Sequence, residues 1–263
     1  MKKIISLLAL FALTFMISPV SAKSGPKAFS LPASAVEVAS GVFSLGQAYD
    51  AQSNSMVDGY ALVHKKSDAK SGGNASVKSG PTCYGYLATG AKWKNLEPWQ
   101  FNPTNTFGLD PNQLFTTESA DIQKWETAAQ FNILANGALT GAALTASTTA
   151  TDGLNAVYFG PLADNSTIAV TIVWGIFSGP TFNRKLVEWD QVFNTNYPWS
   201  LSGEVGKMDF ENISTHELGH AVGMADIYTS SCSAVTMYGY ANFGDTNKRT
   251  LEAPDITGIN GLY

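Results

Sequence analysis

Two histidines and a glutamate stand at a spacing that suits metal chemistry. His216 and His220 are four residues apart, so on an α-helix they lie about 40° apart on one face and can bind one ion. Glu217 lies about 100° from His216 around such a helix, where it can reach a water at the metal without binding the metal itself. Imidazole nitrogens and a carboxylate oxygen suit Zn²⁺, and a catalytic zinc site has three protein ligands. The sequence therefore predicts one zinc ion and requires a third ligand.

The third ligand cannot be a histidine that follows His220. The chain contains three histidines, and the remaining one, His64, lies far upstream and is expected to be an exposed residue without a role. Gly223 can end the helix in a left-handed conformation and turn the chain back. Asp226, three residues later, would then reach the metal and is the predicted ligand. Glu252, on a later helix, is the alternative.

The helix that positions these groups needs an apolar side and a start. Leu218 and Val222 lie away from the histidines on the helix, where a stripe that faces the core belongs. Asp209 is placed to cap its first turn. The sequence therefore predicts a helix that is apolar on one side and carries the ligands on the other.

Residues 216–226 read H-E-x-x-H-x-x-G-x-x-D, which resembles the zinc-binding signature of the metzincin metalloproteases. Most metzincins have a histidine at the place of Asp226, whereas the snapalysin family has an aspartate there. Residues 235–240 resemble the Met-turn that runs beneath the metal in metzincins, with Met237 expected as a packing floor. Residues 251–263 are similar to the last helix of matrixins, and residues 190–199 to the stretch before their active-site helix.

The resemblance covers residues 93–263 and implies a fold and an activity. The implied fold is of the α/β (α+β) class: a twisted five-stranded mixed sheet with a long helix, an active-site helix, a Met-turn and a C-terminal helix. The implied activity is cleavage of protein or peptide substrates that lie extended along an edge strand. Animal matrixins have a second zinc site built from histidines, and this sequence has no further histidines to form it. A Ca²⁺ ion is possible, but no calcium-loop signature supports it.

The expected function is that of a zinc-dependent endopeptidase. A metal-activated water attacks the peptide bond, and Glu217 acts as the general base. Tyr238 and Tyr240 are candidates to donate to the developing oxyanion, although packing in a pocket wall accounts for them more simply. The alternative is a secreted binding or surface module that keeps a metal site without catalysis. Glu217 argues against it, because a binder needs no base at that place.

The N-terminal residues have the pattern of a secretory signal. Lys2 and Lys3 precede an apolar run from Ile4 to Ile17, and a small residue, Ala22, ends the segment. The run is shorter than the roughly 20 residues of a membrane-spanning helix. We therefore expect a signal peptide over residues 1–22, a secreted protein, and no stable membrane anchor after cleavage.

Export would place the chain's two cysteines in an oxidising compartment. One disulfide between Cys83 and Cys232 is therefore predicted, although their spacing does not prove it. The alternative is that the Cys83 thiol plugs the zinc, since residues 81–85 faintly resemble the matrixin pro-segment. The flanking Arg and Asp of that segment are missing here.

Composition divides the chain before the predicted catalytic domain. Residues 23–64 contain two alternating stretches, Gly41–Leu45 and Val57–Val63, that predict a hairpin, and they form a candidate pro-region. Residues 65–80 are nearly all Lys, Ser, Gly, Ala and Asn and predict a flexible linker that proteases can nick. The catalytic domain is expected over residues 81–263, long enough for one sizeable core.

Within that domain, hydrophobic periodicity predicts the remaining elements. A helix capped by Thr117 would carry apolar residues at helical spacing as far as Ile133. Residues 135–153 are rich in Ala, Thr and Gly and predict a loop or a ragged hairpin. Strands are predicted at residues 99–102, 155–159, 168–174 and 186–189.

Overall composition excludes several classes of protein. The chain is 44% hydrophobic and 14% charged, which supports a buried core and excludes wholesale disorder. Its net charge of −5 is the opposite of the positive charge that binding to nucleic acid or to an anionic membrane requires. A monomer that acts on proteins or peptides is the expectation.

Overall fold

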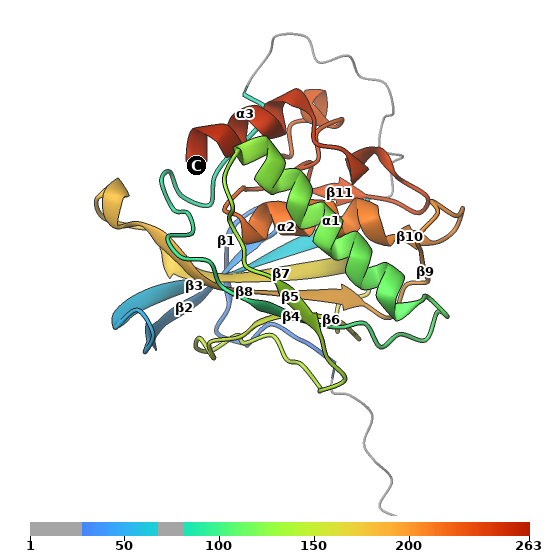
Figure 1. Ribbon diagram of the computed structural model, residues 1–263, viewed down its shortest axis with the longest axis horizontal. Helices are drawn as coiled ribbons and strands as arrows, with labels where there is room; N and C mark the ends of the chain where they lie inside the picture. Colours follow the sequence, from blue (N-terminus) through green and yellow to red (C-terminus); the bar gives the residue numbers. More distant parts are fainter. Residues whose placement is uncertain (1–27, 68–81) are drawn as a thin grey trace, which may run out of the picture.

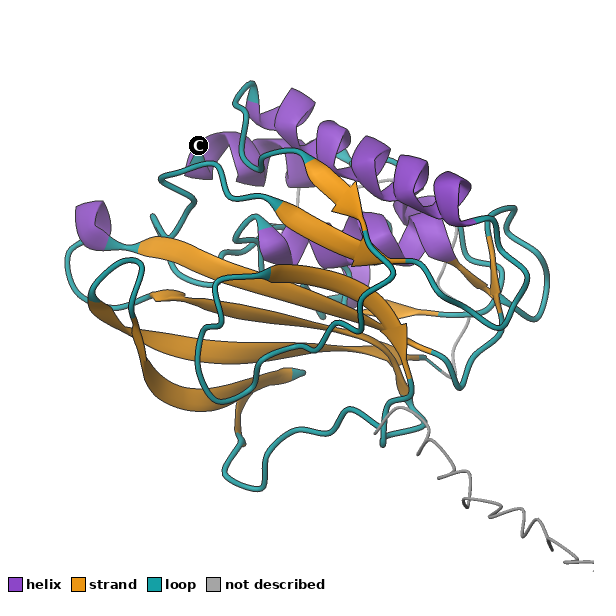
Figure 2. Ribbon diagram, turned by 60° about the horizontal axis from the view of Figure 1, so that its bottom comes forward, coloured by secondary structure: helices purple, strands orange, loops and turns teal. Residues whose placement is uncertain are grey.

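The structure, a computed structural model, describes residues 28–67 and 82–263. The predicted signal peptide and residues 68–80 of the predicted linker lie outside the described residues. One large mixed sheet carries three α-helices on one side (Figure 1, Figure 2). No helix in the described part of the chain is both long and apolar enough to cross a bilayer.

The main sheet has nine strands in the order β1-β2-β3-β7-β8-β6-β4-β5, with β11 beside β3. The strands β4, β5, β6 and β8 are parallel and β7 is antiparallel to β8, so these five form the predicted mixed sheet. The expected total of five strands is too low because four further strands extend this sheet. The bounds are β1 (Val36–Ala39), β2 (Val42–Asp50), β3 (Ser55–Lys66), β4 (Trp99–Asn102), β5 (Gly137–Leu139), β6 (Asn155–Gly160), β7 (Thr167–Ile176), β8 (Lys185–Asn194) and β11 (Tyr240–Ala241). A small separate sheet pairs β9 (Trp199–Ser200) with β10 (Met208–Asp209).

The predicted N-terminal hairpin is present, but it is not a separate unit. The strands β2 and β3 form it, and β3 also pairs with β7 in the antiparallel sense. Lys65 and Lys66, which were expected to begin the linker, belong to β3 because their backbone pairs with neighbouring strands. Residues 28–66 therefore fold into the same sheet as the domain that was expected to begin at residue 81. The sequence did not indicate this, because the end of β3 has the polar composition of a linker.

The helices α1 (Pro111–Ala129), α2 (Phe210–Ala221) and α3 (Ala253–Leu262) pack on the same face of the sheet. The helix α1 begins well before the predicted Thr117, since Asp110 caps it by accepting from the Gln113 amide at 2.9 Å. It ends at Ala129 because Gln130 adopts a left-handed conformation, so Ile133 is buried but lies outside the helix.

Alternation along β3 decides which side chains reach the helices. Leu62 belongs to the core between the sheet and the helices, whereas Ala61 and Val63 belong to a second core on the opposite face. Because side chains two residues apart share a face, His64 points with Leu62 toward α2. The second core is covered by residues near the N-terminus and by the loop before β6, including Phe29, Leu31, Ala146 and Ala150.

Candidate metal centre

The helix α2 begins and ends as its sequence predicts. The Asp209 carboxylate accepts from the Asn212 amide at 3.0 Å and caps the first turn. Two bonds from Arg249, of 2.6 and 2.8 Å, hold this carboxylate in place. Leu218 and Val222 are buried in the core, as expected.

Gly223 ends the helix in a conformation that few other residues adopt. Its φ is +104°, and the next amide, that of Met224, donates back to the Gly219 carbonyl at 2.8 Å. A side chain at Gly223 would also meet the Ala91 carbonyl at 2.9 Å. The chain therefore reverses at this point and brings Asp226 alongside the helix.

Three side chains, which we call the ligand group, converge at the end of this turn: His216, His220 and Asp226. Their ligand atoms all lie within 4.8 Å of one another. The Asp226 Oδ1 atom is 3.2 Å from His216 Nε2 and 3.5 Å from His220 Nε2. The two imidazoles are fully buried, and the Asp226 side chain is 2% exposed.

These three atoms are buried without hydrogen-bond partners. Among the described residues, none forms a hydrogen bond with His216 Nε2, His220 Nε2 or Asp226 Oδ1. Buried polar atoms in native proteins are nearly always satisfied, so three that face one another call for a cation. Two imidazole nitrogens and a carboxylate oxygen match the ligands of catalytic zinc and leave a fourth position open. The residues present therefore fit Zn²⁺.

Backbone carbonyls orient both imidazoles for ligation. His216 Nδ1 lies 2.7 Å from the Thr236 carbonyl, and His220 Nδ1 lies 3.0 Å from the Met224 carbonyl. Because a carbonyl only accepts, each Nδ1 carries the hydrogen, and the lone pair is at Nε2. This outer layer of contacts is typical of histidines that bind metals.

Charge in the ligand group follows from burial and proximity. Burial, with nearby Lys248, lowers the pKa of His216 to about 3, which keeps its imidazole neutral. Burial opposes ionisation of Asp226, yet His220 and His216 hold the pKa of its carboxyl well below the usual range. Asp226 in turn raises the pKa of His220 above its ordinary value against the effect of burial. The group thus offers an ionised carboxylate beside a neutral imidazole.

Glu217 projects from α2 beside the ligand group and is fully buried. The Thr171 hydroxyl, from β7, donates to its Oε2 at 2.6 Å, and His64 Nδ1 lies 2.9 Å from its Oε1. Burial raises the pKa of Glu217 to about 7. Both oxygens of the predicted base are therefore engaged by side chains from the sheet.

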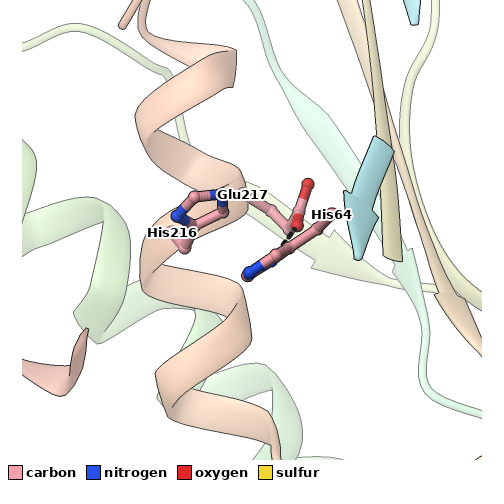
Figure 3. Close-up of side chains that lie close together, drawn as sticks. All are labelled: His64, His216 and Glu217. Carbon is pink, nitrogen blue, oxygen red and sulfur yellow. Dashed lines mark hydrogen bonds and ion pairs between the residues drawn. The ribbon is translucent and has the colours of Figure 1, made fainter. Parts of the chain in front are cut away.

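His64 is the clearest error of the sequence analysis. It was expected to be exposed, but its exposed fraction is 0%. Figure 3 shows its ring beside Glu217 and His216, with ring centroids of the two histidines 3.9 Å apart. Its place two residues after Leu62 on an alternating strand was the one signal that it faces the helices.

Lys248 is a second residue that the sequence did not indicate. It lies in the short 3₁₀ helix Asn247–Arg249 and is 1% exposed. Its Nζ is 3.0 Å from His64 Nε2 and also donates to the Tyr238 carbonyl. Burial lowers the pKa of Lys248 to about 7. We call His64, Glu217, Thr171 and Lys248 the base group.

The predicted Met-turn runs beneath α2. Met237 is fully buried, and its Sδ leaves no room for a side chain at Gly219 of α2, so the turn packs directly on the helix. Asp255 of α3 accepts from the amides of Thr236 and Met237 at 2.9 and 3.3 Å. Since the Thr236 carbonyl orients His216, α3 supports the ligand group through this turn.

The predicted pocket-wall tyrosines pack against each other. Tyr238 and Tyr240 meet edge to face, and Tyr240 meets Tyr228 in the same way, with centroids 5.8 and 5.2 Å apart. This agrees with the packing interpretation of both residues. The hydroxyl that reaches the ligand group is that of Tyr228, which donates to Asp226 Oδ2 at 3.2 Å.

The structure also places the two residues for which the sequence left alternatives, Cys83 and Glu252. Cys83 and Cys232 form a disulfide with Cα atoms 5.5 Å apart, so the Cys83 thiol does not plug the zinc site. Glu252 caps α3 through a reciprocal pair of bonds with the backbone and side chain of Asp255. It belongs to neither group of three potential ligands among the described residues.

The mixed sheet, the histidine-bearing helix, the Met-turn and the C-terminal helix together define a metallopeptidase of metzincin-like architecture. Comparison with protein families is more specific, because the matrixin family model matches residues 175–263, from the end of β7 to the C-terminus. This match supports a metallopeptidase, and the matrixin family implies a zinc cofactor and protein or peptide substrates. No curated protein matches the chain.

Proposed function

We propose that the chain is a secreted zinc endopeptidase. The observation that carries this proposal is the meeting, beside Glu217, of three buried ligand atoms that lack hydrogen-bond partners among the described residues. A binding module with an idle metal site would not need a buried carboxylate at the place of Glu217, where ionised groups are costly. The ligand group and the base group therefore favour catalysis.

Each side chain has a separate role in the proposed reaction. His216, His220 and Asp226 hold the zinc, which supplies Lewis acidity toward a water and the peptide carbonyl when it is bound. Glu217 accepts a proton from the attacking water at its carboxylate and delivers it to the nitrogen of the leaving amine. Thr171 fixes the orientation of that carboxylate through its hydroxyl.

Secretion is supported by two independent features of the chain. Residues 1–22, outside the described residues, have the composition of a signal peptide. The Cys83–Cys232 disulfide is expected only in an oxidising compartment. Mass spectrometry of the protein from the culture medium should find an N-terminus at Lys23 or later; a chain that begins at Met1 would contradict secretion by this route.

The test of catalysis is Glu217→Gln, with Glu204→Gln as a matched control on the exposed surface. Both variants are assayed with zinc and an unfolded protein as substrate, before and after limited proteolysis of the chain. Glu217→Gln should retain one zinc per chain and lose about 10²–10⁴-fold in turnover, the usual contribution of a general base. The control should be unchanged, and a near-normal rate for Glu217→Gln would remove Glu217 from the mechanism.

A further inference from the structure

Lys248 is the one Lys or Arg side chain among the described residues that is fully buried. Its Nζ contacts the Tyr238 carbonyl, His64 Nε2 at 3.0 Å and His216 Nδ1 at 3.3 Å. None of these groups carries a negative charge, and within the described ranges no carboxylate lies within ion-pair distance of Nζ. Buried cations are nearly always paired, because an isolated charge loses its hydration. Lys248 therefore lacks the counter-ion that its burial calls for.

Two neighbouring cations, which are more exposed, do have counter-ions. Arg249, the next residue, pairs with Asp209 at 2.6 Å, and Lys124 of α1 pairs with Asp121 at 2.6 Å. Both of these cationic side chains are 27% exposed, so water also stabilises their charges. The chain thus leaves unpaired the cation that most needs an anion. This points to an anion that the chain does not itself supply.

Lys248 is held at a fixed place beside the proposed base. Its amide donates to Asn212 Oδ1 of α2 at 2.7 Å, and its Nζ donates to the Tyr238 carbonyl, which follows the Met-turn. The ring of His64 lies between Nζ and the Glu217 carboxylate, with Nε2 toward Lys248 and Nδ1 2.9 Å from Glu217 Oε1 (Figure 3). One side-chain ring therefore separates this ammonium from the carboxylate that would act on the peptide bond.

The contact with His64 shows which kind of group fits this place. An ammonium only donates, so His64 Nε2 meets Lys248 Nζ as an acceptor. A substrate side chain next to the scissile bond that took the position of this ring would meet the same donor. A carboxylate is the acceptor that binds an ammonium most strongly, because the two groups carry opposite charges.

The charge of the proposed zinc centre also favours an anion. Asp226 and Glu217 supply two negative charges when both are ionised, whereas a bound Zn²⁺ and Lys248 supply three positive charges. The carboxylates of Asp245 and Asp255 act on Lys248 from beyond ion-pair distance and accept from backbone amides. One positive charge therefore remains at the centre, and a low local dielectric strengthens its attraction for a negative group.

Building on the proposed function, we propose that Lys248 makes this peptidase selective for substrates with an acidic side chain, Asp or Glu, next to the scissile bond. Lys248 Nζ binds the carboxylate of the substrate, and the Tyr238 carbonyl keeps Nζ in position. Lys248 is a specificity residue and takes no part in the proton transfer.

The experiment compares quenched fluorescent peptides that differ only in Glu or Gln, with one pair for each side of the scissile bond. The full chain is loaded with zinc and assayed before and after limited proteolysis. On one of the two sides, kcat/KM should be about 10- to 100-fold higher for Glu than for Gln, as expected for a bond between charged groups. The difference should lie in KM, because Lys248 binds the carboxylate equally in the ground state and the transition state.

Substitutions at Lys248 assign the preference to its ammonium. Lys248→Met should reduce the Glu-to-Gln ratio to within about threefold, because the ammonium is gone. Lys248→Arg keeps the charge and should keep part of the preference. Lys207→Met, at an exposed ion pair with Glu204, is the matched control and should keep all of it. The comparison of the two peptides needs only the unaltered chain, so it stands even if Lys248→Met does not fold.

Binding provides a second measurement that does not depend on turnover. Labelled forms of the two peptides are titrated against zinc-loaded Glu217→Gln, with and without Lys248→Met, and followed by fluorescence anisotropy. The Glu peptide should bind at least about tenfold more tightly than the Gln peptide. Lys248→Met should remove this difference.

The outcomes separate this inference from the proposed function. Cleavage of both peptides with equal kcat/KM would overturn the acidic preference and leave the peptidase standing. A preference for Glu that persists in Lys248→Met would overturn the role of Lys248. Absence of both binding and cleavage would overturn the two proposals together. Tighter binding of the Glu peptide without hydrolysis of any peptide by the unaltered chain would support the acidic site and count against the proposed peptidase.

Discussion

Two groups of side chains meet at α2, and they differ in whether their hydrogen bonds are satisfied. The ligand group leaves three buried atoms without partners among the described residues, although each unsatisfied atom costs about 1–3 kcal/mol. In the base group, both oxygens of Glu217 and both nitrogens of His64 have partners. The first group is thus complete only with a cation, whereas the second is complete with a strand of the chain itself.

The sharpest way to break this comparison is to remove the carboxylate from the ligand group. Asp226→Ala should lower zinc affinity by more than about 100-fold, because loss of a direct ligand exceeds the 10- to 100-fold loss typical of outer contacts. Competition with a chromogenic chelator measures this. Glu252→Ala is the control, since it removes a helix cap and no ligand. Unchanged affinity in Asp226→Ala would show that the three atoms are not a zinc site.

The next largest effect is expected at Asp255, which supports the ligand group from α3. Asp255→Asn replaces an acceptor by an amide donor opposite the Thr236 and Glu252 amides, which both bond its Oδ2. The unfolding free energy should fall by about 2 kcal/mol, and zinc affinity by about tenfold as His216 loses its orientation. Calorimetry and chelator competition measure the two effects. Thr257→Ala, on the exposed side of α3, should change neither, and a stability loss with unaltered zinc affinity would limit Asp255 to folding.

The contrast between the two groups also explains what the sequence could predict. The ligand group could be predicted because the period of a helix fixes how His216 and His220 face each other. The cap at Asp209 sets the start of α2, and the turn at Gly223 sets the position of Asp226. The base group was not, because His64 and Glu217 are 153 residues apart and meet through sheet pairing. No local spacing encodes that pairing. The two lysines that end β3 even gave it the composition of a linker.

The fold divides in the same manner. The strands β4, β6 and β7 and the helix α2 carry their own patterns and were predicted close to their observed bounds. The strand predicted at residues 186–189 is only the first part of β8, which continues to Asn194, and α3 was expected from the resemblance to matrixins. The start of α1 was missed because Asp110-Pro111 is a stronger start than Thr117 and went unrecognised. The addition of β1–β3 to the sheet was missed because long-range strand order depends on which edge is free, and sequence alone does not report edges.

Lys248 offers a way to disturb mainly the base group, because its contact with the ligand group is with His216 Nδ1, at 3.3 Å, whose hydrogen already bonds to the Thr236 carbonyl. Lys248→Met keeps the length of the side chain but removes its donors to His64 and Tyr238. Hydrogen exchange at the end of β3 should accelerate about tenfold, while zinc affinity stays within about threefold. Lys207→Met, at an exposed ion pair with Glu204, is the control. A large loss of zinc affinity would instead place Lys248 among the supports of His216.

A third buried cluster also packs on α2. Its hydrogen bonds should be completed by a proton on one of its carboxyl groups rather than by a metal cation. The Ser214 hydroxyl lies 2.7 Å from carboxylate oxygens of both Glu118 and Asp121. A hydroxyl has one proton to donate, so one of the two carboxyls must be protonated and donate to Ser214. Burial raises the pKa of Glu118 to about 8 and that of Asp121 to about 7. Asp121 and, less strongly, Glu217 add to the rise in the pKa of Glu118, whereas Lys124 lowers the pKa of Asp121 and Glu211 raises it.

The smallest predicted effect is the pH dependence that follows from this cluster. Because the folded state retains protons that the unfolded chain releases above about pH 4, stability is fully present below that pH and falls as the pH rises toward 8. Glu118→Gln carries its own donor at every pH, so its unfolding free energy should fall less steeply between pH 5 and 8, by on the order of 1 kcal/mol per pH unit. Glu188 and Asp190, whose pKa values burial also raises, contribute equally to both proteins and cancel in the difference. Urea unfolding at several pH values measures the two slopes, and parallel curves would show that Glu118 is ionised in the folded protein.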